Sequence, residues 1–356
     1  MWSFVLTAVG LLILWLGIVE TWIAVLYPRA VSGPATAGTY RVYHYVSQKL
    51  LGAKSRLLLF SGPVLIVCQA TVWASLLLLG ISLIVWPQLG RGIVSAGGGP
   101  TDTAFVTAAY YAGFSVTTLG TGDLAPQTPF TRMVTITAAA IGFSFFTLVL
   151  AYIIAVYGAL GRRNQFASEI DYRTGRTGNT LPYLKSYLIS DDRSLLHQDL
   201  VDLASGLADL LESHHFYPAL HYFRFSEPRY AMSRMLRFCL EVSSAMRALN
   251  EVRECEVNPE PTERLWHASL QSLEDAIKHF VICRASPGGV DVSLAERLAE
   301  HFQDRDAGFD GEAFVSAYRD GCKQWADDLK SLERCTMTGR YPIADEGECC
   351  GSSGTG

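Results

Sequence analysis

Thr117-Thr118-Leu119-Gly120-Thr121-Gly122-Asp123 is the stretch of this chain from which the fold is best argued. It follows a short apolar segment, Ala104–Val116, whose composition suits a helix. The C-terminal pole of such a helix carries partial negative charge and favours a cation beside it. Gly120 and Gly122 permit the left-handed dihedrals that allow successive carbonyl groups to face one axis. The stretch therefore predicts a backbone site for cations, to which the Thr118 hydroxyl can add.

The surrounding sequence predicts a membrane domain. A helix needs about 20 apolar residues to cross the hydrocarbon core, and three runs have this length: Phe4–Leu26, Leu57–Val85 and Phe130–Gly158. Ala104–Val116 is too short to cross, so we expect a re-entrant helix, capped by Thr101 or Asp102. We prefer a retained first helix over a signal peptide, because no basic region precedes that long run.

The charges divide the chain into two parts. Residues 1–163 contain only three of the 34 acidic residues but nine of the 29 lysines and arginines. The remainder is polar and net negative, which argues against nucleic acid as a partner. A membrane part followed by a soluble part explains this division. The domains predicted are an N-terminal helix with an interfacial segment over 1–56, a pore domain over 57–163, a helical domain over 164–342 and a disordered tail over 343–356.

Basic residues predict the orientation in the membrane. They gather in the loop between the first two runs and at the end of the third: Arg29, Arg41, Lys49, Lys54, Arg56, Arg162 and Arg163. The positive-inside rule places both clusters in the cytoplasm. We therefore expect a multi-pass protein of the plasma (inner) membrane, with its N-terminus outside and the domain after Arg163 in the cytosol.

Two features near the first run leave alternatives open. Thr39–Leu51 has Tyr43, Val46 and Leu50 at helical spacing, which fits an amphipathic helix in the membrane interface or an ordinary linker. Glu20 is an acid inside a spanning run. Such residues are site candidates, although this one also lies close enough to the end of its run to reach the interface.

The polar part reads as helical. Asp191 and Asp192 can cap a helix to about Glu212. Further helices are expected over Pro228–Leu249, Thr262–Cys283, Ser293–Gln303 and Gly311–Cys335. No alternating strand pattern stands out. The predicted fold class is all-α, with three transmembrane helices, a re-entrant pore helix and a helical cytosolic domain.

The opening stretch resembles the selectivity filter of the bacterial potassium channels, whose usual form is T-V-G-Y-G-D. Residues 118–123 fall on its six positions, and the resemblance covers about residues 57–160. Leu119 is a mild change, whereas Thr121 replaces the aromatic residue of the family. The resemblance implies potassium ions held by Thr118, Leu119, Gly120 and Thr121, within a filter that also includes Thr117 and Gly122.

The resemblance also implies supporting residues. Tyr110 and Tyr111 fall where many small bacterial channels carry a tryptophan pair behind the filter. Asp123 would steady the filter by a hydrogen bond, or would be a solvated charge at its mouth. Gly142 falls at the hinge of the family's inner helix, although small residues also serve close helix packing in membranes.

These observations predict a homotetrameric potassium channel in the lipid bilayer, since one chain supplies one quarter of each carbonyl ring. We expect no enzymatic activity and no cofactor, with potassium ions as the permeant species. The soluble domain would serve assembly or gating, and the sequence indicates no ligand or partner for it. The alternatives are a weakly selective monovalent cation channel and a non-conducting membrane receptor or scaffold.

Overall fold

The computed structural model describes residues 2–27, 33–51, 60–189, 193–253, 258–280 and 288–335. Arg29, Lys54, Arg56, the Asp191–Asp192 cap and the tail from 343 lie outside these ranges. The chain forms two compact units. The first, here called the membrane unit, contains residues 1–158 and 215–223, and the second, the helical unit, contains residues 159–214 and 224–356. Apart from two short strands the described residues are helical and irregular, which confirms the all-α class.

Three helices of the described chain are long and apolar enough to cross a membrane, as expected. They are α1 (Trp2–Leu26), α3 (Ser61–Val85) and α5 (Pro129–Arg173). Between the first two lies α2 (Pro34–Leu51), which begins earlier than the interfacial helix expected from the sequence. The helix α5 is 45 residues long and continues well past Gly158, because its later apolar residues Phe166, Ala167 and Ile170 join the core of the helical unit.

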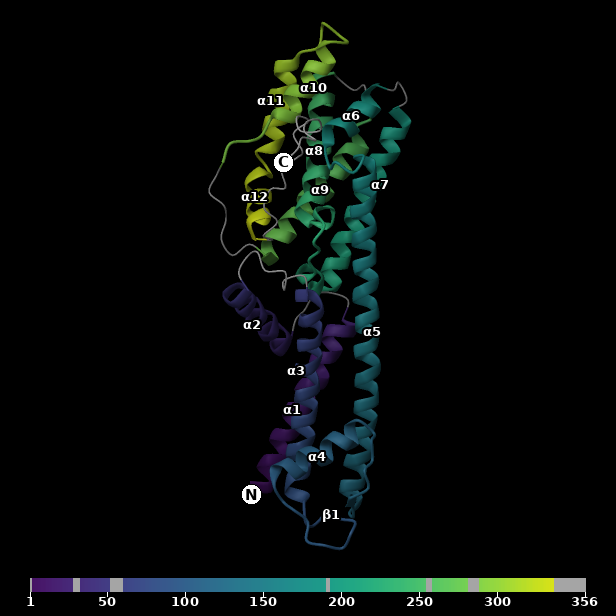
Figure 1. The fold of residues 1–356 in the computed structure, drawn as a ribbon, viewed down its shortest axis with the longest axis vertical. Helices are drawn as coiled ribbons and strands as arrows, with labels where there is room; N and C mark the ends of the chain where they lie inside the picture. The colour runs from purple at the N-terminus through teal and green to yellow at the C-terminus, as the bar shows by residue number, and fades with distance from the viewer. Residues whose placement is uncertain are drawn as a thin grey trace, which may run out of the picture. The chain divides into compact units, whose positions relative to one another are not determined.

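In the membrane unit, α1 packs along α3 (Figure 1). Gly10 on α1 faces Gly80 on α3, and a Cβ atom at Gly10 would lie 2.7 Å from the Gly80 carbonyl oxygen. Gly17 lies against Leu76 and Leu77 of α3 in the same way. Inside a membrane the hydrophobic effect does not drive helices together, and small residues favour their association because they allow the two backbones to approach closely. The first helix is thus a packed part of this unit.

The re-entrant helix is α4 (Phe105–Val116), which packs against α3. Strand β1 (Ile93–Ser95) pairs antiparallel with β2 (Leu124–Pro126), so the chain before α4 is bonded to the chain after the filter segment. A core beneath them gathers residues of α3, α4, β2 and α5, including Ile81, Tyr111, Phe114, Leu124 and Ala138. This core and the small sheet fix both ends of the filter segment, Thr117–Asp123.

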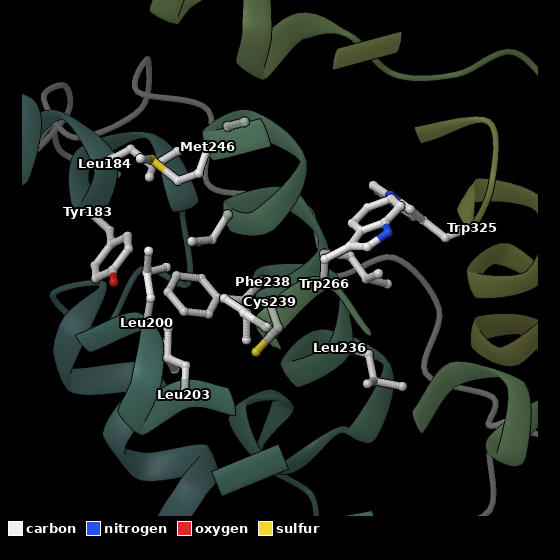
Figure 2. Close-up of a cluster of buried hydrophobic side chains, with 14 of the residues drawn as sticks. Tyr183, Leu184, Leu200, Leu203, Leu236, Phe238, Cys239, Met246, Trp266 and Trp325 are labelled. Carbon is white, nitrogen blue, oxygen red and sulfur yellow. The ribbon is translucent and has the colours of Figure 1, made fainter. Parts of the chain in front are cut away.

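The helical unit contains α6 (Thr180–Ile189), α7 (Arg193–Phe216), α8 (Met232–Val252), α9 (Pro259–Phe280), α10 (Ser293–Gln303), α11 (Gly311–Cys322) and α12 (Ala326–Cys335). Helix α8 is at its centre and packs against α9, α11 and α12. Phe238, Cys239 and Met246 of α8 lie among residues such as Leu200 and Trp266 (Figure 2).

Two helices of this unit differ from the sequence prediction. The single helix expected over Gly311–Cys335 is two helices, because the chain turns at Lys323–Trp325. The turn buries the Trp325 ring, whose indole N–H donates to the Ser244 hydroxyl at 3.1 Å. Helix α6 was not expected at all. Its Tyr183 and Leu184 are buried in the core, where tertiary packing outweighs a weak local pattern.

The glycine contact between α1 and α3 gives a first prediction. Gly10→Ala places a methyl group against the backbone of α3, which cannot rotate away, so we expect the protein to lose about 1–3 kcal/mol of stability. Gly38→Ala on α2 is the matched control, because a Cβ atom there meets nothing within 4 Å, and it should be neutral or gain up to about 1 kcal/mol. Thermal unfolding in detergent, followed by tryptophan fluorescence, measures both. Equal behaviour of the two variants would contradict this packing.

Candidate ion pathway

The filter segment begins where α4 ends, and the start of α4 is fixed by Asp102. Its carboxylate accepts hydrogen bonds from the Ala104 backbone N–H at 3.0 Å and from the Thr107 hydroxyl at 2.5 Å. The N-cap residue of α4 is Ala104, which makes no side-chain cap hydrogen bond, so neither Thr101 nor Asp102 is the N-cap that was expected. Asp102 instead bonds the first turn from two residues before the cap. The Thr101 hydroxyl instead accepts the backbone N–H of Ser95, which ties the preceding loop to strand β1.

The C-terminal end of α4 closes in a motif that usually contains glycine. The Thr118 N–H donates to the Ser115 carbonyl at 3.2 Å, and the Leu119 N–H donates to the Phe114 carbonyl at 2.9 Å. These two bonds define a Schellman motif, which requires a left-handed residue after the helix. That residue is Thr118, with φ 56°. A β-branched residue is rarely found in this conformation, and such strain is held only where the surrounding structure imposes it.

The left-handed conformation recurs at every second residue of the filter segment. Thr118, Gly120 and Gly122 have φ values of 56°, 59° and 79°, whereas Leu119 and Thr121 are not left-handed. Left-handed residues at alternate positions allow successive peptide groups to turn to the same side. An ordinary strand would alternate them. The segment can therefore present a row of carbonyl oxygens to one axis, which is the arrangement a dehydrated cation needs.

Thr121 is bonded to the acid at the end of the filter segment. Its hydroxyl donates to Asp123 at 2.5 Å, and the Asp123 carbonyl accepts the Ala96 N–H at 2.8 Å. The Thr121 hydroxyl, aided by the Tyr110 hydroxyl, holds the pKa of Asp123 below its usual range. The carboxylate is therefore ionised at neutral pH and places a fixed negative charge beside the filter segment.

The two tyrosines of α4 have different environments. Tyr111 is 1% exposed, and its hydroxyl lies 2.5 Å from the Thr135 hydroxyl on α5. Tyr110 is exposed. Both rings pack edge-on against Phe114. Sequence reasoning missed Thr135, because a threonine in an apolar run gives no signal until its partner is known.

Gly142 lies where α5 comes closest to the end of α4. A Cβ atom at this position would be 1.9 Å from the Val116 carbonyl oxygen. Only glycine allows this approach, and the contact places α5 directly against the base of the filter segment. Close packing thus accounts for the glycine, while a hinge at this position stays a prediction.

The filter segment is exposed in the single chain. Every residue from Thr117 to Asp123 is exposed, and Leu119 is 70% exposed. Apart from the adjacent residues of the chain, no atom lies within 4 Å of the Cβ positions built at Gly120 and Gly122. One chain therefore positions the filter backbone from one side and leaves its other side open.

Comparison with known proteins agrees with this geometry. Residues 64–158 match the model of a family described as ion channel. The chain is also 26% identical over 214 residues to the uncharacterized membrane protein YdjJ of Bacillus subtilis (strain 168). That alignment covers 60% of this chain and 61% of the relative, so the chain spans about three fifths of that protein's length. No solved structure matches.

The matched region contains α3, α4, the filter segment and the first part of α5. These elements form an ion-channel domain of the two-helix type, and the resemblance drawn from the filter sequence is confirmed. The protein is a membrane protein with an ion-channel domain.

The contact at Gly142 gives a prediction that separates packing from a hinge. Gly142→Ala should destabilise the protein by roughly 2 kcal/mol or more, because the methyl group meets a backbone oxygen. Gly158→Ala, on the same helix with nothing within 4 Å, should be neutral or mildly stabilising. Thermal unfolding of the purified protein measures both. A stabilised Gly142→Ala variant would favour the hinge and contradict the packing role.

Proposed function

We propose that four copies of this chain form a potassium channel, whose ions pass through rings of backbone oxygens from residues 118–121. The observation that carries this proposal is the left-handed conformation at Thr118, Gly120 and Gly122. Carbonyls turned to one side can replace the hydration shell of an ion, and four such strands make stacked rings. The ion-channel domain at 64–158 supports the same reading.

The exposure of the filter segment supports assembly. In the single chain the filter segment is exposed along its whole length, and Leu119 is 70% exposed. Non-helical backbone at membrane depth is tolerated only where protein or a water-filled path surrounds it. Three further copies around one axis would provide both a protein wall behind each strand and the water-filled path in front of it.

The chemistry of conduction follows from these groups. Thr118 can add a ring of hydroxyl oxygens at the inner end of the filter, and the C-terminal pole of α4 gives partial negative charge behind it. Asp123 is ionised at neutral pH, its pKa being lower still than that of a free aspartate, and four such carboxylates would concentrate cations at the other end. No residue is required to react, so the proposed role is transport without catalysis.

Thr121 determines how selective we expect the channel to be. In the channels that the filter resembles, an aromatic side chain packs behind the filter at this position. Here a hydroxyl bonds Asp123 instead, and leaves the ion ligands in place because they are backbone oxygens. At this position the filter backbone is thus supported by one hydrogen bond instead of by aromatic packing. We infer that potassium permeates best, with a smaller margin over sodium than an aromatic filter gives.

Reversal potentials test the proposal directly. The purified protein in planar bilayers should carry a cation current whose bi-ionic reversal potential favours potassium over sodium. Thr121→Tyr should widen the preference, whereas Thr121→Val, which removes only the hydroxyl that bonds Asp123, should narrow it. Sodium permeating as well as potassium in the native protein would show the weakly selective channel. Absence of any current, together with a monomer in native mass spectrometry, would refute the pore.

The orientation is also part of the proposal. Basic residues on α2 and at Arg162–Arg163 favour the cytoplasmic side of the plasma membrane. The N-terminus and the loop between α3 and α4 would then lie outside, so that Asp123 is at the external mouth. The helical unit would be cytosolic, where we propose that it acts in assembly or gating.

The segment that includes the end of α7 and the chain following it offers a route for gating. Residues His215–Phe223, here called the return segment, belong to the membrane unit although the residues on both sides of them belong to the helical unit. The Ser61 hydroxyl at the start of α3 donates to the Tyr222 carbonyl. The Tyr222 ring stacks on the Tyr40 ring with 5.8 Å between the ring centroids, and it contacts the Tyr43 ring edge-on with 5.9 Å between the centroids. One residue thus contacts both α2 and α3.

The return segment also contacts α5. The Tyr217 ring lies 6.2 Å from that of Tyr152, and the Phe223 ring lies 5.8 Å from that of Tyr157. Phe223 is 5% exposed and lies against Gly62, where a Cβ atom would be 2.5 Å from its ring. Since α5 is the inner helix of the proposed pore, a shift of this segment would shift the end of that helix. We propose that the helical unit gates the pore through it.

Phe223→Ala tests this route. Loss of the buried ring, worth on the order of 3 kcal/mol, should free the end of α5 and speed amide exchange at Tyr152–Gly158 about tenfold or more. The open probability should change while the potassium-to-sodium ratio stays the same. Phe309→Ala, an equal truncation buried in the helical unit, should leave exchange at Tyr152–Gly158 unchanged. The same exchange in native protein and Phe223→Ala would exclude the return segment as the link.

A further inference from the structure

The helical unit contains a cavity beside its central helix. It lies between α8, α12 and the chain just before α10, and its volume is about 60 Å³. One water needs only about 10–15 Å³ of such space, so the cavity has room for a molecule of a few heavy atoms. Trp325, Leu329 and Val290 give it an apolar wall, but most of the other side chains around it are charged. Cavities that stay empty are apolar, so a charged lining indicates a polar occupant.

Ion pairs hold the side of the cavity that α8 forms. Arg237 Nη2 lies 2.6 Å from a carboxylate oxygen of Glu333 on α12, and Arg237 Nη1 lies 3.7 Å from one of Glu241, a turn further along α8. Glu241 also accepts a hydrogen bond from the Thr180 hydroxyl at 2.6 Å. These charged groups are held in place by the fold itself, which lowers the entropic cost of binding a ligand there.

Negative charge is in excess around the cavity. Four carboxylates and two basic side chains line it: Glu241, Asp291, Asp327, Glu333, Arg237 and Lys330. Burial raises the pKa of Glu241, and the charge of Asp291 adds to the rise, although Arg237 opposes it. A positive group beside these two carboxylates would favour their charged forms. The lining therefore favours an occupant that carries a cation.

The cation that fits is an ammonium group. Within the ranges that the structure describes, no group of three or more His, Cys, Asp or Glu residues is placed to hold a metal ion. An ammonium group needs only hydrogen-bond acceptors, which Glu241 and Asp291 supply. The carbon atoms attached to it can pack on the apolar wall, where the Trp325 ring also attracts a cation.

Lys330 provides a site for a negative group. Its ammonium makes no hydrogen bond or ion pair with any residue of the described chain, and its Nζ atom lies beside the backbone of Gly288. Asp327 accepts the Gly288 N–H at 3.1 Å, which fastens this part of the chain to α12. Lys330 thus lies in the cavity lining with its charge available to a carboxylate of the ligand.

We propose that this cavity binds a small amino acid. The ammonium group of the ligand lies against Glu241 and Asp291, its carboxylate binds Lys330, and a short side chain packs on Trp325. An amino acid carries both charges on adjacent atoms of one small molecule, so it meets both requirements of the lining within the available volume. The bound ligand would join α8, at the centre of the helical unit, to α12.

Isothermal titration calorimetry of the full chain in detergent tests the ligand class. Glycine and alanine should each bind saturably, once per chain, with a dissociation constant of about 10 µM to 1 mM. Methylammonium and acetate, which carry one of the two charges each, should bind about tenfold more weakly or less. No saturable binding of glycine or alanine, or equal binding of methylammonium or acetate, would overturn the proposal.

Substitutions test the two ends of the ligand separately. Lys330→Gln should weaken alanine binding about tenfold and leave the weak binding of methylammonium unchanged, whereas Asp291→Asn should weaken both. Lys323→Gln is the matched control, because this exposed lysine of the same unit pairs with Asp320 outside the cavity, and it should change neither. Native affinity for alanine in Lys330→Gln, with an unchanged thermal midpoint, would refute carboxylate recognition. These measurements need no ion current, so failure here is separate from failure of the channel proposal.

Discussion

The left-handed backbone at three alternate residues of the filter segment is the constraint that the rest of the membrane unit has to maintain. Thr118, Gly120 and Gly122 hold φ values that a chain does not keep unaided, least of all at a threonine. The Schellman bonds fix the first of them, and the pairing of β1 with β2 fixes the chain beyond the last. Local backbone strain of this kind persists where rigid neighbours impose it. The packing around α4 is therefore needed to keep the filter segment in its conformation.

Several contacts that hold the filter segment are short-range contacts between uncharged groups. Gly142 admits the Val116 carbonyl, and Tyr111 joins α4 to Thr135 on α5. Asp123 is charged, and it accepts a hydrogen bond from the hydroxyl of Thr121, which stands where an aromatic residue was expected; this bond lowers the pKa of Asp123. Threonine in place of the aromatic residue therefore replaces packing behind the filter with a hydrogen bond to the charged Asp123. The position of the Thr121 side chain is thereby linked to the charge at Asp123.

Much of the membrane unit could be predicted from sequence, because apolar length and the filter motif are local signals. The three spanning runs, the short α4 and the fold class follow from them and are confirmed. The role of Glu20 could not be read in the same way. An acid near the end of an apolar run is compatible with several environments, and its partners, Ala35 and Thr36, lie 15 and 16 residues further along the chain. Side-chain partners distant in sequence have no local pattern.

The return segment shows why a domain boundary read from composition can mislead an experiment. The charge change near Arg163 suggests that a chain cut there would leave an intact pore domain. The membrane unit, however, includes His215–Phe223, whose aromatic rings contact α2 and α5 and whose Tyr222 carbonyl accepts a bond from α3. A truncation near residue 166 removes these contacts together with the helical unit. Loss of current after such a cut would therefore not show that the helical unit itself is needed, whereas Phe223→Ala changes the contact alone.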